Sequence, residues 1–238
     1  MGSAAAARVR ASLGTMLAAE FSEVAPHGIT DRRSGRKQVQ RDPAVLPALA
    51  IYDPEVTLDL PAGQTAGTAM NALAHGVEAG YARDASPLVA PVALEAIHRI
   101  MRSLPACLSN GHDLEAREDL LTGAHLAGFS IANARMALHH GLCHVLGGRS
   151  GAAHGTLNAV LLPHVMRFNS AFLPSGISAE GVAALVATLP LPARLRDAGV
   201  PAGLLPVVAS EAAASPTAGA NPRPASEAEI LDLLRAAW

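Results

Sequence analysis

Histidines with helical spacing are the residues of this sequence best suited to chemistry. His140 and His144 are four residues apart, so a helix would carry both on one face. Asn71 and His75 form a second pair with the same spacing. His154 follows a glycine-rich break at the start of the next predicted helix, where its ring can turn back toward the same pocket. Two packed helices and one turn histidine would therefore enclose a polar pocket.

Neutral imidazoles that converge from different elements suit a first-row divalent metal such as Fe²⁺ or Zn²⁺. Three histidines and an amide oxygen from Asn71 would leave one position open, where the ion could polarise a substrate carbonyl. Spacing alone also permits a second interpretation, in which these rings are hydrogen-bonded groups of the core. We predict that structural role for the isolated histidines, which are His27, His98, His112, His125 and His164.

The elements that must position these residues are predicted to be helices. Apolar residues recur at helical spacing from residue 61 to Trp238. The predicted helices span residues 65–81, 87–104, 114–132, 134–146, 156–169, 178–189 and 227–237. We expect breaks at Pro87, Pro105, Gly147-Gly148, Pro163, Pro174, Pro192 and Pro201. Residues 209–226 read as an exposed loop that ends at a helix cap made by Ser226 and Glu229.

The first 60 residues have a mixed pattern, so the chain divides into a region 1–60 and a helical domain 61–238. Residues 47–54 resemble a short buried strand that ends in an Asp53-Pro54 turn. A further strand or turn is expected near residues 12–24. The fold class is therefore mainly α.

Composition excludes several classes of protein. Half of the residues are hydrophobic and 16% are charged, which indicates a packed domain and not a disordered chain. A net charge of −2 provides no basic face for nucleic acid. No apolar run is long enough to predict a membrane span. Two cysteines cannot build a disulfide framework, so we expect a cytoplasmic protein.

Two motifs in the helical region resemble the signatures of iron-containing alcohol dehydrogenases. One comprises residues 140–148 (HGLCHVLGG) and 154–166 (HGTLNAVLLPHVM), and the other comprises residues 67–79 (GTAMNALAHGVEA). Asn71, where that family usually has aspartate, and the doubled His139-His140 resemble the maleylacetate reductase branch. Residues 191–201 and 221–224 are similar to the C-terminal part of the same family. The resemblance implies a helical bundle like the C-terminal domain of these enzymes, preceded by a short remnant of an α/β dinucleotide-binding domain.

The resemblance also implies roles for individual residues. His75, His140 and His154 would be the histidine ligands of a divalent metal, Fe or Zn, and Asn71 would take the fourth ligand position. His144 matches a histidine beside the nicotinamide and substrate and would donate a proton. Thr15 matches a threonine that contacts the cofactor. The implied reaction is NAD(P)H-dependent reduction of maleylacetate, a small carboxylated oxo compound, to 3-oxoadipate in the degradation of aromatic compounds.

Three departures from the family pattern qualify this interpretation. Gly141 stands where the maleylacetate branch carries a lysine, Asn71 replaces the usual aspartate, and no glycine-rich phosphate loop precedes the helical region. The resemblance covers residues 13–238 and predicts an N-terminally truncated chain that is inactive alone. Either another chain covers its exposed apolar face or the protein is unstable or vestigial, and we expect a homodimer or other oligomer. Two alternatives stay open: a metal-dependent alcohol dehydrogenase acting on a small alcohol or aldehyde, and a non-catalytic helical relic that binds metal or a partner.

Overall fold

The computed structural model describes residues 26–30, 37–41 and 50–238, and it describes side chains from residue 50 onward. Several sequence predictions lie outside this part of the chain. They concern Thr15, the side chain of His27, the strand or turn near residues 12–24, and residues 47–49 of the predicted strand.

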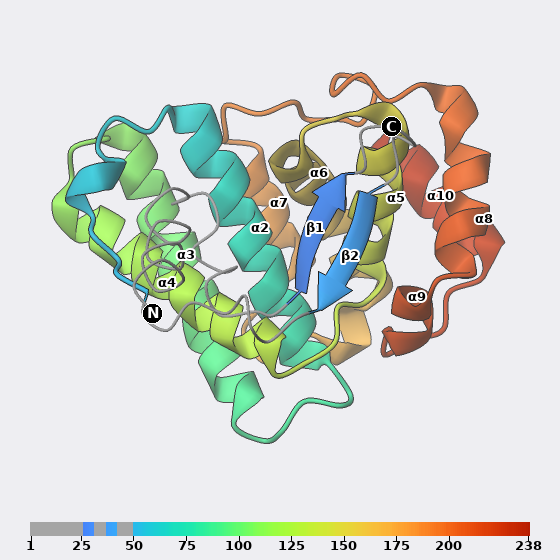
Figure 1. Cartoon of the computed structure of the whole chain (residues 1–238), viewed down its shortest axis with the longest axis horizontal. Helices are drawn as coiled ribbons and strands as arrows, with labels where there is room; N and C mark the ends of the chain where they lie inside the picture. Colours follow the sequence, from blue (N-terminus) through green and yellow to red (C-terminus); the bar gives the residue numbers. More distant parts are fainter. Residues whose placement is uncertain (1–25, 31–36, 42–49) are drawn as a thin grey trace, which may run out of the picture.

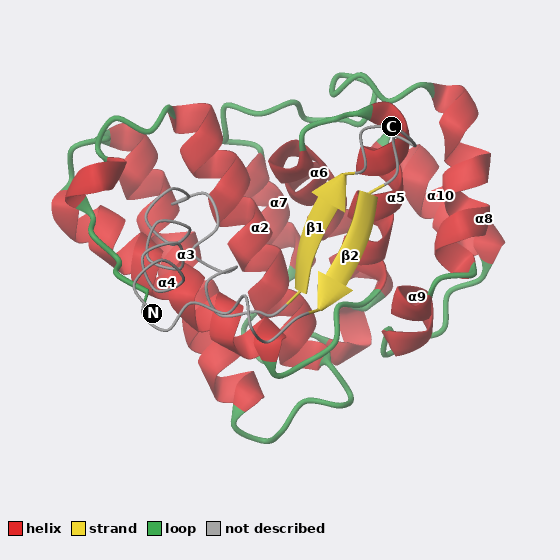
Figure 2. Ribbon diagram, in the orientation of Figure 1, coloured by secondary structure: helices red, strands yellow, loops and turns green. Residues whose placement is uncertain are grey.

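A small hairpin precedes a region made almost entirely of helices (Figure 2). Strands β1 (Pro26–Thr30) and β2 (Lys37–Arg41) pair antiparallel, with Pro26 opposite Arg41. After the short turn η3 (Glu55–Thr57), the long helices are α2 (Ala62–Tyr81), α3 (Val89–Ser109), α4 (Leu114–Ala132), α5 (Leu138–Ser150) and α6 (His154–Phe168). Shorter elements complete the described chain: η4 (Ser170–Phe172), α7 (Ala179–Val186), η5 (Ala202–Leu204), α8 (Leu205–Ala213), α9 (Pro216–Ala220) and α10 (Glu227–Ala237). The mainly α fold class is confirmed.

Two hydrophobic clusters fill the helical region, and α6 contributes to both. One side of α6, including Leu162 and Met166, packs against the cluster formed by α2, α3 and α7. The other side, including Leu161 and Val165, packs with α5, α8 and α10. Figure 1 accordingly shows α3 and α4 toward one end of the molecule and α8, α9 and α10 toward the other. Because α2, α5 and α6 meet where the two clusters join, polar residues on these helices are brought together inside the protein.

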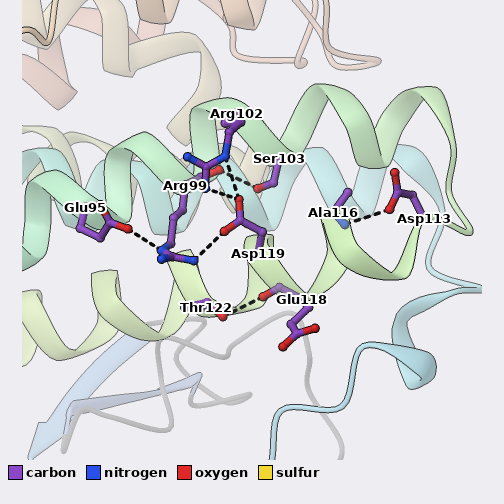
Figure 3. Close-up of polar contacts among 9 residues, drawn as sticks. All are labelled: Glu95, Arg99, Arg102, Ser103, Asp113, Ala116, Glu118, Asp119 and Thr122. Atoms are coloured by element: carbon purple, nitrogen blue, oxygen red, sulfur yellow. Dashed lines mark hydrogen bonds and ion pairs between the residues drawn. The ribbon is translucent and has the colours of Figure 1, made fainter.

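Ion pairs hold α3 against α4 on the protein surface. The carboxylate of Asp119 accepts hydrogen bonds from Arg99 and Arg102, both at 2.7 Å, as Figure 3 shows. Arg99 also contacts Glu95 one helical turn away. Exposed pairs of this kind contribute little individually. Burial of residues such as Ile97 and Ile100 on the other side of α3 supplies most of its attachment.

Helices α2 and α6 approach each other at a pair of glycines. A Cβ atom added to Gly155 would lie 2.6 Å from the Cα atom of Gly67, closer than real contacts allow. Gly155 directly follows His154, and Gly67 lies one turn before Asn71. The glycine pair therefore sets how closely the start of α6 approaches the polar face of α2.

Several predicted breaks in the helices were wrong. Pro105 lies within α3 and Pro163 within α6. Pro105 is exposed, so water can hydrate the carbonyl group that its ring leaves without an intrahelical donor. Pro163 is buried, and packing on both sides of α6 outweighs the local cost of the proline. Helix α5 continues through the predicted Gly147-Gly148 break and ends at Gly151, whose φ of 72° suits a glycine.

Two further predictions about local structure need correction. Residues 50–54, the described part of the predicted strand, contain no strand. The predicted loop over residues 209–226 instead contains the end of α8 and all of α9. The cap before α10 is confirmed, because the Ser226 hydroxyl accepts from Glu229 N and the Glu229 carboxylate accepts from Ser226 N. None of the described helices has both the length and the apolar composition that a membrane crossing requires.

The glycine contact between α2 and α6 predicts a large effect of one methyl group. Gly155→Ala should lower the free energy of unfolding by about 1–3 kcal/mol, because α2 and α6 must separate to admit the Cβ atom. Urea denaturation followed by circular dichroism measures this loss. Gly148→Ala is the matched control, since a Cβ there meets nothing within 4 Å and alanine favours a helix. Equal stability of the two variants would contradict the proposed contact.

Candidate functional site

Helices α2, α5 and α6 bring four of the sequence-predicted histidines together. His75 comes from α2, His140 and His144 from α5, and His154 from the first position of α6. His75 and His140 are buried, whereas His144 and His154 are partly exposed. Asn71 is also buried, one helical turn before His75 on the same face of α2. The predicted pocket residues thus meet between the three helices, with His144 and His154 nearer to solvent.

The rings form two stacked pairs. The centroids of His75 and His140 are 4.4 Å apart with planes inclined by 16°, and those of His144 and His154 are 5.7 Å apart with planes inclined by 21°. His140 links the two pairs through inclined contacts, because its centroid lies 6.2 Å from that of His144 and 6.3 Å from that of His154. The four imidazoles therefore form one cluster between α2, α5 and α6.

A buried carboxylate that the sequence analysis did not select holds this arrangement in place. Glu78 Oε2 contacts His140 Nδ1 at 2.8 Å and accepts from Ala137 N at 2.9 Å, and Glu78 Oε1 accepts from His139 N at 2.8 Å. A periodic signal could have revealed it, because Asn71, His75 and Glu78 are spaced four and three residues apart on one face of α2. A buried glutamate needs hydrogen-bond partners.

His140 presents one nitrogen to the pocket. Its Nδ1 atom faces Glu78, and its Nε2 atom is buried without a hydrogen-bond partner among the described residues. Buried polar atoms are rarely left in this state. The Nε2 atom therefore marks the point in the pocket where a ligand or a metal ion would be held.

Burial controls the charge of these groups. It lowers the pKa of His75 and of His140 well below the usual histidine value, and neighbouring histidine rings lower the pKa of each further. Burial also lowers the pKa of His139 to about 3. For Glu78, burial raises the pKa, while His139 and nearby backbone N–H groups act in the opposite direction. The inner rings are therefore neutral at pH 7, which is the form that binds metals and accepts hydrogen bonds.

Two groups of side chains around His140 carry atoms of the kind that bind metal ions. Among the described residues, Glu78, His139 and His140 form a group of three potential ligands whose donor atoms all lie within 4.8 Å of one another. The three histidines predicted from the sequence do not form such a group. Glu78 accepts from Ala137 N and His139 N and contacts His140 Nδ1, and His139 Nε2 lies 3.2 Å from the carbonyl oxygen of Asn158. Glu78 and His139 Nε2 are therefore engaged in structural contacts, whereas His139 Nδ1 is buried without a hydrogen-bond partner among the described residues. The neutral rings of His75, His140 and His154 suit a divalent metal in donor type, and they supply no carboxylate to the ion.

His139, also missed by the sequence analysis, belongs to a buried structural group behind the pocket. Cys143 Sγ lies 3.8 Å from His139 Nε2 and 3.8 Å from Asn158 Oδ1. Burial raises the pKa of the Cys143 thiol well above its usual value. Because the thiol is buried and protonated, this Cys-His-Asn group ties α5 to α6 and provides no nucleophile.

Gly141 has no space for the lysine that the maleylacetate branch carries. A Cβ atom added there would lie 2.2 Å from Thr217 Oγ1 and 3.1 Å from Thr217 Cβ. Thr217 lies on α9, and its hydroxyl is 2.6 Å from that of Ser215. A pair of uncharged hydroxyl groups therefore lies over α5 beside His140.

The isolated histidines have different environments from those predicted. His98 and His112 are exposed, so the expectation that they are core groups was wrong. His98 lies on the exposed side of α3, and His112 lies in the turn between α3 and α4. His125 is half-buried, and its Nδ1 lies 3.3 Å from the Tyr52 hydroxyl, while His164 is half-buried on α6.

This chain is similar in sequence and in structure to known proteins. Residues 65–178 match the family described as "Fe-containing alcohol dehydrogenase family, C-terminal". The chain is 38% identical over 229 residues to a maleylacetate reductase of Burkholderia cepacia, covering 91% of this chain and 64% of the relative. It is 36% identical over 215 residues to a 1,3-propanediol dehydrogenase of Citrobacter freundii, covering 81% of this chain and 56% of the relative.

A solved structure gives the same result. The crystal structure of maleylacetate reductase from Agrobacterium tumefaciens superimposes with a TM-score of 0.84 at 35% sequence identity, covering 92% of this chain and 65% of the other. The chain thus spans somewhat less than two thirds of the length of these relatives.

The neutral state of the inner histidines predicts that acid destabilises the protein. His139 keeps its ring unprotonated down to about pH 3 in the folded chain, whereas an unfolded histidine has a pKa near 6.5. Because the unfolded state binds more protons below pH 6.5, the free energy of unfolding falls as the pH drops from about 6.5 toward 3. We expect His139 alone to contribute a loss of about 2 kcal/mol by pH 5.

Urea denaturation of the metal-free protein between pH 7.5 and pH 5 measures this loss. His98→Gln, which changes an exposed histidine of α3, is the control and should leave the pH dependence unchanged. A free energy of unfolding that stays constant over this range would contradict the neutral buried rings.

Proposed function

Because this chain belongs to the Fe-containing alcohol dehydrogenase family, we propose that it is an NAD(P)H-dependent reductase of the maleylacetate reductase type. The observation that carries the proposal is the cluster of His75, His140, His144 and His154, in which the buried Nε2 atom of His140 has no hydrogen-bond partner among the described residues. The proposed substrate is a small carboxylated oxo compound, maleylacetate, whose conjugated carbon–carbon double bond is reduced to give 3-oxoadipate.

A divalent metal such as Fe²⁺ or Zn²⁺ would be held by His75, His140 and His154, with the amide oxygen of Asn71 as a further donor. When bound, such an ion supplies Lewis acidity toward a carbonyl oxygen. Neutral ligands alone bind a dication less tightly than a set that includes a carboxylate. We therefore expect the ion to be removed easily by chelators.

NADH or NADPH supplies the hydride in the proposed reaction. Addition of hydride to the double bond leaves negative charge on the conjugated oxygen, and a proton must then reach the neighbouring carbon. The partial exposure of His144, beside His154, supports this role, because its ring can regain a proton from solvent. The inner rings of His75 and His140 stay neutral, the form in which they would hold the ion.

A second function is favoured by one observation. Thr217 lies where the Cβ atom of a side chain at position 141 would be, so this chain has a glycine and a threonine hydroxyl at the place of the lysine that the maleylacetate branch carries. An uncharged aldehyde would then be bound as readily as a dicarboxylate. The relevant alternative is a metal-dependent alcohol dehydrogenase, in line with the 36% identical 1,3-propanediol dehydrogenase.

Cofactor binding and substrate choice test these proposals on the 238-residue chain. We expect NADH or NADPH to change its fluorescence on binding and maleylacetate to be reduced faster than simple aldehydes. Activity should be compared before and after treatment with a chelator. Aldehyde reduction abolished by the chelator, without reduction of maleylacetate, would replace the first function with the second. Absence of cofactor binding at millimolar concentrations would exclude both and favour a non-catalytic chain.

Substitution of His144 tests the proton transfer. His144→Ala should lower kcat by about 10²–10⁴-fold, the usual contribution of a general acid, while affinity for NAD(P)H is retained. His98→Ala, on the exposed face of α3, is the control and should keep normal turnover. Full activity of the His144→Ala enzyme would remove this residue from the mechanism.

A further inference from the structure

We infer that Glu78 is a positioning residue that fixes His140 in one tautomer and caps α5 from a neighbouring helix. Its carboxylate is fully buried, accepts from Ala137 N and His139 N, and contacts His140 Nδ1, all at 2.8–2.9 Å. The inference deepens the proposed function and rests on it only for the consequences for turnover. The hydrogen-bond geometry stands without it.

The beginning of α5 depends on this carboxylate. The residue before the helix is Ala137, whose side chain cannot accept hydrogen bonds from the backbone N–H groups that the first turn leaves without intrahelical partners. Glu78 accepts from two of these groups, Ala137 N and His139 N. Its negative charge also lies at the positive end of the helix dipole. In α10, by contrast, Ser226 and Glu229 form the cap within the same segment.

The same carboxylate selects the tautomer of His140. Two backbone N–H groups, Ala137 N and His139 N, donate to Glu78 and favour its ionised form. An ionised carboxylate can only accept, so we place the ring proton of His140 on Nδ1, which lies 2.8 Å from Glu78 Oε2. The lone pair then lies on Nε2, the buried atom that has no partner among the described residues. Carboxylate–histidine pairs of this kind orient imidazole ligands in other metal and ligand sites. His140 is therefore an acceptor at its pocket nitrogen, and a proton for the substrate must come from another ring.

Replacement of Glu78 by glutamine conflicts with this network in either orientation. If the amide oxygen faces Ala137 N and His140 Nδ1, the NH₂ group points at the N–H of His139. If the amide is turned over, the NH₂ group points at the N–H of Ala137 and donates to His140 Nδ1, which moves the ring proton to Nε2. Glu78→Gln keeps the size of the side chain and removes its negative charge, so it tests the role of the carboxylate at constant size.

The primary test is ¹⁵N NMR of the metal-free chain with labelled histidine, with His140→Gln used to assign the signal. We expect the wild-type His140 to carry its proton on Nδ1, and Glu78→Gln to shift the population toward the Nε2-protonated ring. Turnover of Glu78→Gln should fall by about 10–100-fold, with the KM for NAD(P)H unchanged. Glu229→Gln is the matched control, because it changes a capping glutamate at a distant helix and should leave both readouts unaltered.

Two outcomes would overturn the inference. One is a wild-type His140 protonated on Nε2. The other is a folded Glu78→Gln protein with an unchanged tautomer and unchanged turnover. Absence of turnover in every protein, together with an Nδ1-protonated His140, would reject the proposed function and leave the positioning role of Glu78 intact.

Discussion

The hydrogen bonds of Glu78 are the interaction on which the rest of the site depends. Withdrawing a carboxylate from water costs several kcal/mol, so a buried glutamate is tolerated only where donors surround it. Glu78 meets three of them, and all belong to the start of α5 or the segment leading into it. Since α2 also carries Asn71 and His75, the same contact fixes the two halves of the pocket relative to each other.

Small residues determine how closely the three helices approach around that contact. Gly67 and Gly155 let the backbones of α2 and α6 touch, which brings His154 into line with the rings of α5. Gly141 allows Thr217 of α9 to lie directly on α5. Close approach at the first pair of glycines brings the histidines together, and close approach at Gly141 leaves a side chain at that position no space beside Thr217.

The chemical character of the pocket follows from its lack of a free charge. Glu78 is committed to backbone and ring N–H groups, and burial keeps His75 and His140 neutral. Such a pocket presents lone pairs to a ligand instead of a fixed anion. Charge in the reaction must then be balanced by the cofactor, by a bound ion, or by a proton from the partly exposed His144. This division between neutral inner rings and a solvent-linked outer ring is consistent with the proposed reductase.

The sequence by itself determined the mainly α fold, the helical pairs Asn71–His75 and His140–His144, and the cap at Ser226, because periodicity and capping act within a few residues. It misplaced the helix breaks at Pro105 and Pro163, where solvation or packing outweighs a local preference. It also missed Glu78 and His139, although Glu78 continues the polar face of α2. Only the tertiary structure decided which polar atoms have hydrogen-bond partners and which remain available to a ligand. Those contacts join residues about 60 positions apart, from Glu78 to His140, and no local pattern encodes such a pairing.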